Sequence, residues 1–204
     1  MRLLTLARDL KRRKSRERHS LFVAEGVRSV EELLRSRITV CGILTAPQLD
    51  GAPRGPNLRS MIASAGVETA SANEDEFRSA AETESPQGVL AIAEVPSHAL
   101  SDLTGRSPLR ILVLDAVQDP GNVGAIVRTA AALGADATVA LPGTVDFWNA
   151  KVVRASMGAS FHHPLIQVSA DEFLAFVEAE KIELWGAEAT GEPVDSVEHS
   201  ARRP

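Results

Sequence analysis

Two clusters of cationic and small polar residues in the second half of the sequence have the types and spacing that suit binding of a phosphorylated substrate. The first cluster contains Asn122, Gly124 and Arg128, behind a strand-like run and a loop. An arginine guanidinium is planar and permanently charged, so it suits a two-point contact with a phosphate. A helix N-terminus adds free N–H groups and a dipole that favours an anion. We therefore expect this loop to grip RNA or another phosphorylated backbone, together with the second cluster, which consists of Lys151, Arg154, Ser156 and Gly158.

A dinucleotide-binding loop is the alternative interpretation of the first cluster. That motif needs a tight strand-to-helix turn, three spaced glycines and an acid about 20 residues later that holds a ribose. Here the five residues AVQDP separate Asp115 from the first glycine, Gly121. Val127 or a neighbour takes the third glycine position, and the next strand ends in Pro142 instead of an acid. The sequence therefore disfavours a dinucleotide.

Helical spacing predicts where the side chains of the two clusters lie. Asn122 and Arg128 are six residues apart, close to two turns, so we expect both near the N-terminal end of one helix and on one face. Lys151 and Arg154 are three residues apart and should share a face of another helix. Both helices follow strands, and α/β folds bind ligands at the carboxyl ends of parallel strands. The two clusters are therefore expected to converge.

The elements that must position these residues form a recognisable pattern. In residues 109–204 the apolar runs 111–115, 137–141, 164–168 and 182–187 are continuous and alternate with helix-like segments. Continuous apolar strands are typical of a parallel sheet that is buried on both faces. Residues 1–96 also alternate strands and helices, which predicts a separate small α/β domain. Residues 97–108 are polar, contain Gly and Pro, and are predicted to be a linker.

The distribution of charge points to a polyanionic partner. Residues 1–18 carry eight basic and two acidic side chains, a local charge of +6, whereas the chain has a net charge of −5, which leaves −11 for the rest. On charge alone, an arm that binds a polyanion and a solvated helix face explain this asymmetry equally well. The candidate phosphate contacts are Lys11, Arg12, Arg13, Lys14, Arg16 and Arg18.

Several kinds of site and location are disfavoured. The single cysteine, Cys41, excludes an intrachain disulfide and a cysteine-based zinc cluster. His162 and His163 are adjacent, and neighbours on a strand point to opposite faces, so we assign no metal site. No apolar run approaches the roughly 20 residues of a membrane span, and the N-terminus does not resemble a secretory signal. We therefore expect a cytoplasmic protein without a membrane partner.

The two clusters together resemble the motifs of the SpoU-type (TrmH-like) RNA 2′-O-ribose methyltransferases of the SPOUT superfamily. The first family motif, N-x-G-x-x-x-R-x-A, is matched by Asn122, Gly124, Arg128 and Ala130. The second, K-x-x-R-x-S-x-G, is matched by Lys151, Arg154, Ser156 and Gly158. Residues 14–34 resemble the start of the family's substrate-binding domain, and residues 84–96 its domain junction. The match covers nearly the whole chain.

The resemblance implies a fold and an activity. The fold is a small N-terminal α/β substrate-binding domain followed by a parallel-sheet methyltransferase domain of the SPOUT, or α/β knot, type. The activity is methyl transfer from S-adenosylmethionine to a ribose 2′-hydroxyl in ribosomal or transfer RNA, by a homodimer. The basic run Lys11–Arg18 then becomes an RNA-backbone contact.

The resemblance also assigns roles to single residues. Arg128 corresponds to the catalytic arginine, and Asn122 would orient it or the ribose. Because a guanidinium stays protonated at ordinary pH, we expect Arg128 to position the phosphate and to stabilise developing alkoxide charge. Lys151 and Ser156 would complete the substrate pocket.

The sequence departs from the family in its third motif. The G-N-E-x-x-G loop and the I-P-M and S-L-N segments, which form most of the cofactor pocket and close the knot, are absent, and the chain stops at HSARRP. We therefore expect a C-terminally incomplete domain, with Gly186 and Ala187 as what remains of the cofactor pocket. A non-catalytic RNA-binding protein, or an inactive fragment of such an enzyme, is the alternative function.

Overall fold

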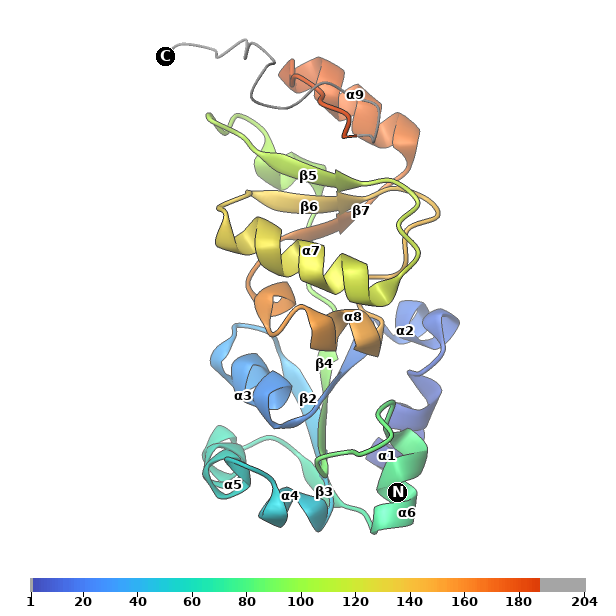
Figure 1. Ribbon diagram of the computed structural model, residues 1–204, viewed down its shortest axis with the longest axis vertical. Helices are drawn as coiled ribbons and strands as arrows, with labels where there is room; N and C mark the ends of the chain where they lie inside the picture. Colours follow the sequence, from blue (N-terminus) through green and yellow to red (C-terminus); the bar gives the residue numbers. More distant parts are fainter. Residues whose placement is uncertain (1, 188–204) are drawn as a thin grey trace.

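The chain builds two separate β-sheets, which lie one above the other along the long axis of the molecule (Figure 1). This computed structural model describes residues 2–187. The four-stranded sheet has the order β1-β4-β2-β3, and the three-stranded sheet has the order β5-β6-β7. Residues 188–204 of the predicted second domain lie outside the described residues.

The N-terminal sheet is mixed, whereas alternating strands and helices suggested only an α/β arrangement. Strand β4 pairs antiparallel with both β1 and β2, and β2 pairs parallel with β3. Its strands are β1 (Leu21–Glu25), β2 (Val40–Thr45), β3 (Thr69–Ser71) and β4 (Val89–Glu94). Its helices are α1 (Arg2–Asp9), α2 (Arg13–His19), α3 (Val27–Arg35), α4 (Gln48–Gly51), α5 (Gly55–Ala65) and α6 (Glu74–Ala80).

Local sequence explains where these helices begin and end. Asn73 and Glu76 form a reciprocal capping box at the start of α6, with Asn73 Oδ1 accepting the Glu76 N–H at 2.9 Å. Gly66 ends α5 with a φ of 65°, a conformation that suits glycine at a helix C-terminus. The α3 side chains Val27, Val30 and Leu33 are buried against the sheet.

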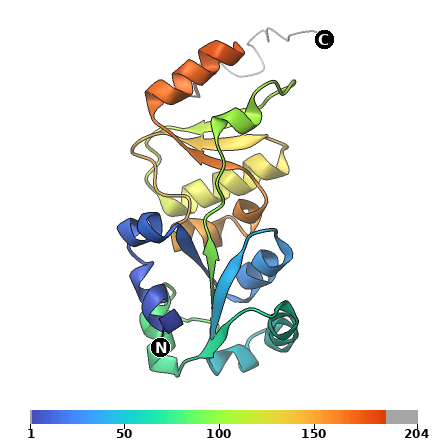
Figure 2. The same ribbon diagram turned by 180° about the vertical axis from the view of Figure 1, so that it is seen from behind.

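The second sheet is entirely parallel, as its continuous apolar strands predict. One face is covered by α7 and α8, and the other by α9 and a short 3₁₀ helix, η1, as Figure 2 also shows. The strands are β5 (Ile111–Leu114), β6 (Ala137–Ala140) and β7 (Leu165–Gln167). The helices are η1 (Leu100–Leu103), α7 (Pro120–Ala132), α8 (Ala150–Ala155), η2 (Ala159–Phe161) and α9 (Ala170–Glu180).

Two expectations about this half of the chain need correction. The predicted linker contains η1, whose Leu100 and Leu103 are buried in the core of the second sheet, so polar composition hid two anchoring leucines. The predicted strand 182–187 is not a strand. Its apolar residues have β propensity, but propensity alone does not make a strand, and neither sheet of the described residues includes this segment. Trp185, within this segment, is 42% exposed.

The two sheets are joined by one continuous hydrophobic core. Phe22 of β1 is fully buried, and its ring centroid lies 4.5 Å from that of Trp148 and 5.9 Å from that of Phe161. These residues belong to a cluster that also contains Val152 and Val153 of α8. The N-terminal half therefore packs against α8, so the two halves are joined by a buried contact as well as by the connecting segment. No helix within residues 2–187 is long and apolar enough to cross a membrane.

Candidate functional site

The two sequence clusters meet beside the carboxyl ends of the parallel strands. The loop 115–119 leads from β5 into α7, and the loop 141–149 leads from β6 into α8. The starts of α7 and α8 lie on the same side of the molecule as α2 in both views (Figures 1 and 2). A small cavity lined by Arg16, Trp148 and Ala150 places α2 directly beside the start of α8.

The N-terminus of α7 is closed by a side chain of its own. Asp119 is the N-cap, and its Oδ1 accepts the Asn122 N–H at 2.7 Å. Pro120 supplies no N–H, and the Val123 N–H is bonded to the Asp119 carbonyl at 3.1 Å. The Asp119 carboxylate therefore occupies one donor of this helix end and adds negative charge, which disfavours the expected binding of phosphate there.

Asn122 and Arg128 are both exposed, but they do not share one narrow face. Val123, Gly124, Val127 and Ala130 form the buried face of α7. At 3.6 residues per turn, six residues leave the two side chains about 120° apart around the axis. They therefore flank the exposed face of α7. Asn122 does not orient the Arg128 guanidinium within this chain, because no hydrogen bond joins them in the described part of the chain.

Gly124 is the point at which α7 and α8 cross. A Cβ on Gly124 would lie 2.5 Å from the Ala155 Cβ and 2.7 Å from the Val152 carbonyl oxygen. Ser156, fully buried, bonds through its hydroxyl to the Val153 carbonyl at 2.7 Å. The expectation that Gly124 and Ser156 contact substrate is wrong for this structure, because both small residues are used for close packing.

Gly158 is also a packing residue. Its φ is 91°, and a Cβ there would lie 2.9 Å from the Glu32 Cβ of α3. Gly158 therefore lets η2 approach the N-terminal half of the chain, and its expected substrate contact is wrong.

Replacing Gly124 with Ala should lower stability. The new methyl would meet helix backbone, and such overpacking costs about 1–3 kcal/mol, more than the gain of up to about 1 kcal/mol in helix propensity. Urea denaturation of Gly121→Ala is the matched control, because a Cβ there would meet only the Asp119 side chain, at 3.1 Å. Equal free energies of unfolding for the two variants would contradict the close crossing.

The two cations of the second cluster do share an exposed face. Lys151 and Arg154 lie on α8 and are exposed, while Val152 and Val153 point into the core. Asn149 caps this helix, with its Oδ1 accepting the Lys151 N–H at 2.9 Å. Neither cation has an ion pair within residues 2–187. Both are available to a phosphate backbone.

The basic N-terminal segment is two packed helices and not an extended arm. Leu3, Leu4, Ala7 and Leu10 bury one side of it. Arg16 was expected to contact RNA, and this is wrong: it is 6% exposed and is bonded to Asp146.

The other five cations of this segment are exposed. Lys11 donates to the carbonyls of Ser79 and Ala81, at 2.9 and 2.7 Å. Arg12 and Arg18 pair with Asp9, and Arg13 pairs with Glu17, which leaves Lys14 without an ion pair among the described residues.

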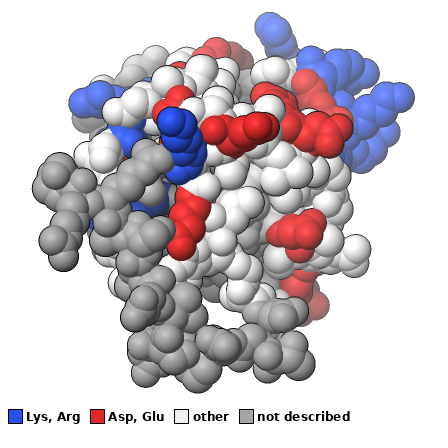
Figure 3. Space-filling view, turned by 90° about the horizontal axis from the view of Figure 1, so that it is seen from above, with Lys and Arg blue, Asp and Glu red and all other residues white. Residues whose placement is uncertain are grey.

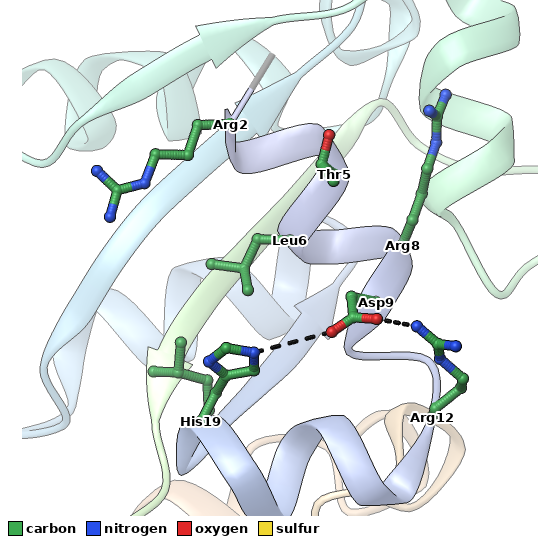
Figure 4. A pocket seen from close by; sticks show the side chains of 8 residues that line it. Arg2, Thr5, Leu6, Arg8, Asp9, Arg12 and His19 are labelled. Atoms are coloured by element: carbon green, nitrogen blue, oxygen red, sulfur yellow. Dashed lines mark hydrogen bonds and ion pairs between the residues drawn. The ribbon is translucent and has the colours of Figure 1, made fainter.

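A hollow of about 850 Å³ opens between α1 and β1, beside the end of α2 (Figure 4). Asp9 lies among its basic side chains, paired with Arg12 and 3.8 Å from the His19 ring. Hydrogen bonds from Ser15 and Arg12 lower the pKa of Asp9, so this carboxylate remains ionised and holds the cations around it. The lining residues are Arg2, Thr5, Leu6, Arg8, Asp9, Arg12, His19 and Leu21.

The surface carries a group of basic side chains at one edge. Seen from the α9 end, several Lys and Arg side chains project at the side where Figure 1 draws α2, and others lie at the opposite side and near the middle (Figure 3). Asp and Glu side chains lie across the middle of this view. The positive region could therefore orient a polyanion towards one side of the protein.

The two residues that the sequence suggested for S-adenosylmethionine binding, Gly186 and Ala187, do not line a pocket within residues 2–187. Gly186 and Ala187 are exposed, and no heavy atom lies within 4 Å of the position of a Cβ on Gly186. Residues 2–187 also contain no group of three or more side chains that could hold a metal. His163 is buried, bonded to Thr138 at 2.8 Å, and burial lowers its pKa. Gly186 and Ala187 therefore do not by themselves form a pocket for S-adenosylmethionine in the described part of the chain.

The sequence analysis did not identify Asp146 and Phe22, two of the residues that connect the two halves. Asp146, Phe22 and Trp148 form the contact between α2, β1 and the loop before α8. Asp146 is an acid in an apolar stretch, TVDFW, which was the available signal. Nothing in the spacing of the residues identifies its partner, which is 130 positions away.

Comparison with known proteins covers both halves of the chain. Residues 109–203 match the SpoU rRNA Methylase family, and residues 5–91 match the MRM3-like substrate binding domain. The chain is 34% identical over 194 residues to the 23S rRNA (guanosine(2553)-2′-O)-methyltransferase RlmP of Bacillus subtilis, covering 95% of this chain and 73% of that protein. It is 41% identical over 86 residues to human mitochondrial rRNA methyltransferase 3, covering 40% of this chain and 20% of that protein.

Solved structures give the same picture. The SpoU methyltransferase AviRb of Streptomyces viridochromogenes, in complex with AdoMet, aligns with a TM-score of 0.77 at 26% identity, covering 88% of this chain and 68% of that one. An AdoMet-bound rRNA methyltransferase of Sinorhizobium meliloti aligns with a TM-score of 0.74 at 26% identity, covering 87% of this chain and 66% of that one.

Proposed function

Because the chain belongs to the SpoU family of RNA methylases, we propose that it takes part in transfer of a methyl group to a ribose 2′-hydroxyl of ribosomal RNA. S-adenosylmethionine is the methyl donor of this family, and the solved neighbours bind it. One observation supports this proposal most strongly. The exposed cations Lys151 and Arg154 lie near the basic helix α2, beside the carboxyl ends of the parallel strands.

Each exposed residue then has a role on the RNA side of the reaction. Lys151 and Arg154 bind backbone phosphates next to the target nucleotide. Arg128 positions the target phosphate and stabilises the alkoxide that forms as the 2′-hydroxyl loses its proton. Asn122 contacts the ribose from the other flank of α7. We also propose that the protein is a cytoplasmic homodimer. Light scattering during size-exclusion chromatography measures its oligomeric state.

The direct test is methyl transfer from labelled S-adenosylmethionine to total RNA isolated from a strain that lacks this gene. Label in ribosomal RNA, mapped to one ribose, is the expected result. Label in transfer RNA would keep the chemistry and change the substrate. RNA binding without any transfer would favour the alternative, a non-catalytic RNA-binding protein.

Charge removal on α2 should weaken RNA binding without unfolding the protein. The combined Arg13→Gln, Lys14→Gln and Arg18→Gln substitutions break two ion pairs of exposed cations, each worth about 0–1 kcal/mol, and the contact between Arg18 Nη2 and the His19 ring at 3.0 Å. If all three cations contact phosphate, the slope of log affinity against log salt should fall by about 2, at roughly 0.7 per contact for a single strand. An unchanged salt slope would show that α2 does not touch the backbone.

A further inference from the structure

A buried ion pair ties the basic helix α2 to the loop that precedes α8. Arg16 Nε and Nη2 lie 2.8 and 2.7 Å from Asp146 Oδ2. The two side chains are only 6% and 9% exposed. Arg16 is therefore the one cation of the segment Lys11–Arg18 that the fold turns inward, onto the other half of the molecule.

Each partner of the pair also fixes its own segment of backbone. Arg16 Nη1 donates to the carbonyls of Leu10 and Lys11, both at 2.9 Å, which holds the turn between α1 and α2. Asp146 Oδ1 accepts the Trp148 N–H at 2.9 Å, which shapes the chain just before α8. Arg16 and Asp146 therefore connect the turn before α2 to the backbone just before α8.

The two halves of the chain do not need this ion pair to pack against each other. Phe22, Trp148 and Phe161 already form an apolar contact between the two halves. Burying two charges costs desolvation energy, and apolar replacements of similar volume are often as stable. What the pair adds is directional geometry, because a guanidinium and a carboxylate bond in few orientations.

We propose that Arg16 and Asp146 are positioning residues that hold the exposed cations of α2 in register with Lys151 and Arg154 on α8. One RNA segment then engages both helices at once, and binding to the first raises the effective concentration at the second. This inference rests on the proposed function, since it concerns the same RNA.

The test is a double-mutant cycle on RNA affinity, measured by fluorescence anisotropy with ribosomal RNA fragments. One arm removes α2 charge with Lys14→Gln, and the other removes α8 charge with Lys151→Gln. When Arg16 and Asp146 are intact, the loss of RNA affinity in the Lys14→Gln, Lys151→Gln double variant should be about tenfold smaller than the product of the losses in the two single variants. The reason is that losing either contact already ends the two-point attachment.

The same cycle is repeated with the pair replaced by apolar residues, Arg16→Met with Asp146→Leu. In this background the affinity losses caused by Lys14→Gln and Lys151→Gln should multiply. The Arg16→Met, Asp146→Leu protein itself should bind RNA less tightly than wild type. The control is Glu31→Leu with Arg54→Met, which removes an ion pair inside the N-terminal half, with 2.8 Å between Arg54 Nη2 and Glu31 Oε2. The control should keep the wild-type coupling even if it lowers the melting temperature.

The outcomes separate the inference from the proposed function. Persistent coupling in the Arg16→Met, Asp146→Leu protein, or no coupling in wild type, overturns the inference while RNA binding stands. No RNA binding by wild type overturns the proposed function, and the inference with it. If the apolar pair does not fold, Arg16→Lys replaces it: lysine keeps the charge but not the planar fork, so coupling should still fall.

Discussion

Replacing Arg128 with Ala should reduce the rate of methyl transfer by about 100-fold or more, the usual cost of removing one donor that stabilises developing negative charge. The fold should survive, because Arg128 is exposed and makes no ion pair within residues 2–187. Affinity for S-adenosylmethionine should remain nearly unchanged, since the side chain is assigned to the RNA side. The measurements are single-turnover methyl transfer and calorimetric titration of the cofactor.

Two further variants sharpen that result. Arg128→Lys should also lose most activity, because lysine cannot make a planar two-point contact. Arg106→Ala is the matched control: Arg106 is an exposed arginine that donates to the Asp102 carbonyl at 3.1 Å, in η1 and its flank, on the other face of the second sheet. It should keep wild-type activity. Loss of cofactor binding in Arg128→Ala would show that the assignment of this helix to RNA is wrong.

Replacing Phe22 with Ala should destabilise the protein by about 3–5 kcal/mol, the range for deleting a fully buried phenylalanine. Because the Phe22 ring packs on Trp148 at 4.5 Å, the loss falls on the contact between the two halves. We therefore expect wild type to unfold in urea in one transition and Phe22→Ala to unfold in two. Tryptophan fluorescence and circular dichroism measure these transitions.

The control for this prediction is Phe77→Ala. Phe77 is also fully buried, but it belongs to a separate cluster inside the N-terminal half, around α1 and α6. Its loss should cost a similar free energy of unfolding without separating the two halves at α8. A single unfolding transition in Phe22→Ala, coincident by both probes and with wild-type stability, would contradict a shared core.

The sequence by itself determined the elements whose signals are local. The continuous apolar strands β5, β6 and β7 predict a buried parallel sheet, because such a sheet has no polar face. The capping box at Asn73 and the glycine at Gly66 mark helix ends through bonds and dihedral angles that lie within a few residues. The motif pattern likewise identified the family, which the comparisons confirm.

The roles of single motif residues were decided only by tertiary structure. Gly124, Ser156 and Gly158 match the motifs, but packing between distant helices makes them packing residues. Residues 182–187 have strand propensity, yet the folded chain includes them in neither of the two described sheets.

The charge of the N-terminal segment shows the same division most clearly. The sequence counts Arg16 with its exposed neighbours, because charge and helical propensity are properties of nearby residues. Only the folded chain brings Asp146 within 2.7 Å and removes both side chains from water. Desolvation depends on what packs against a residue from far along the chain, so the sequence predicted a basic surface and the structure decided which of its cations remain exposed.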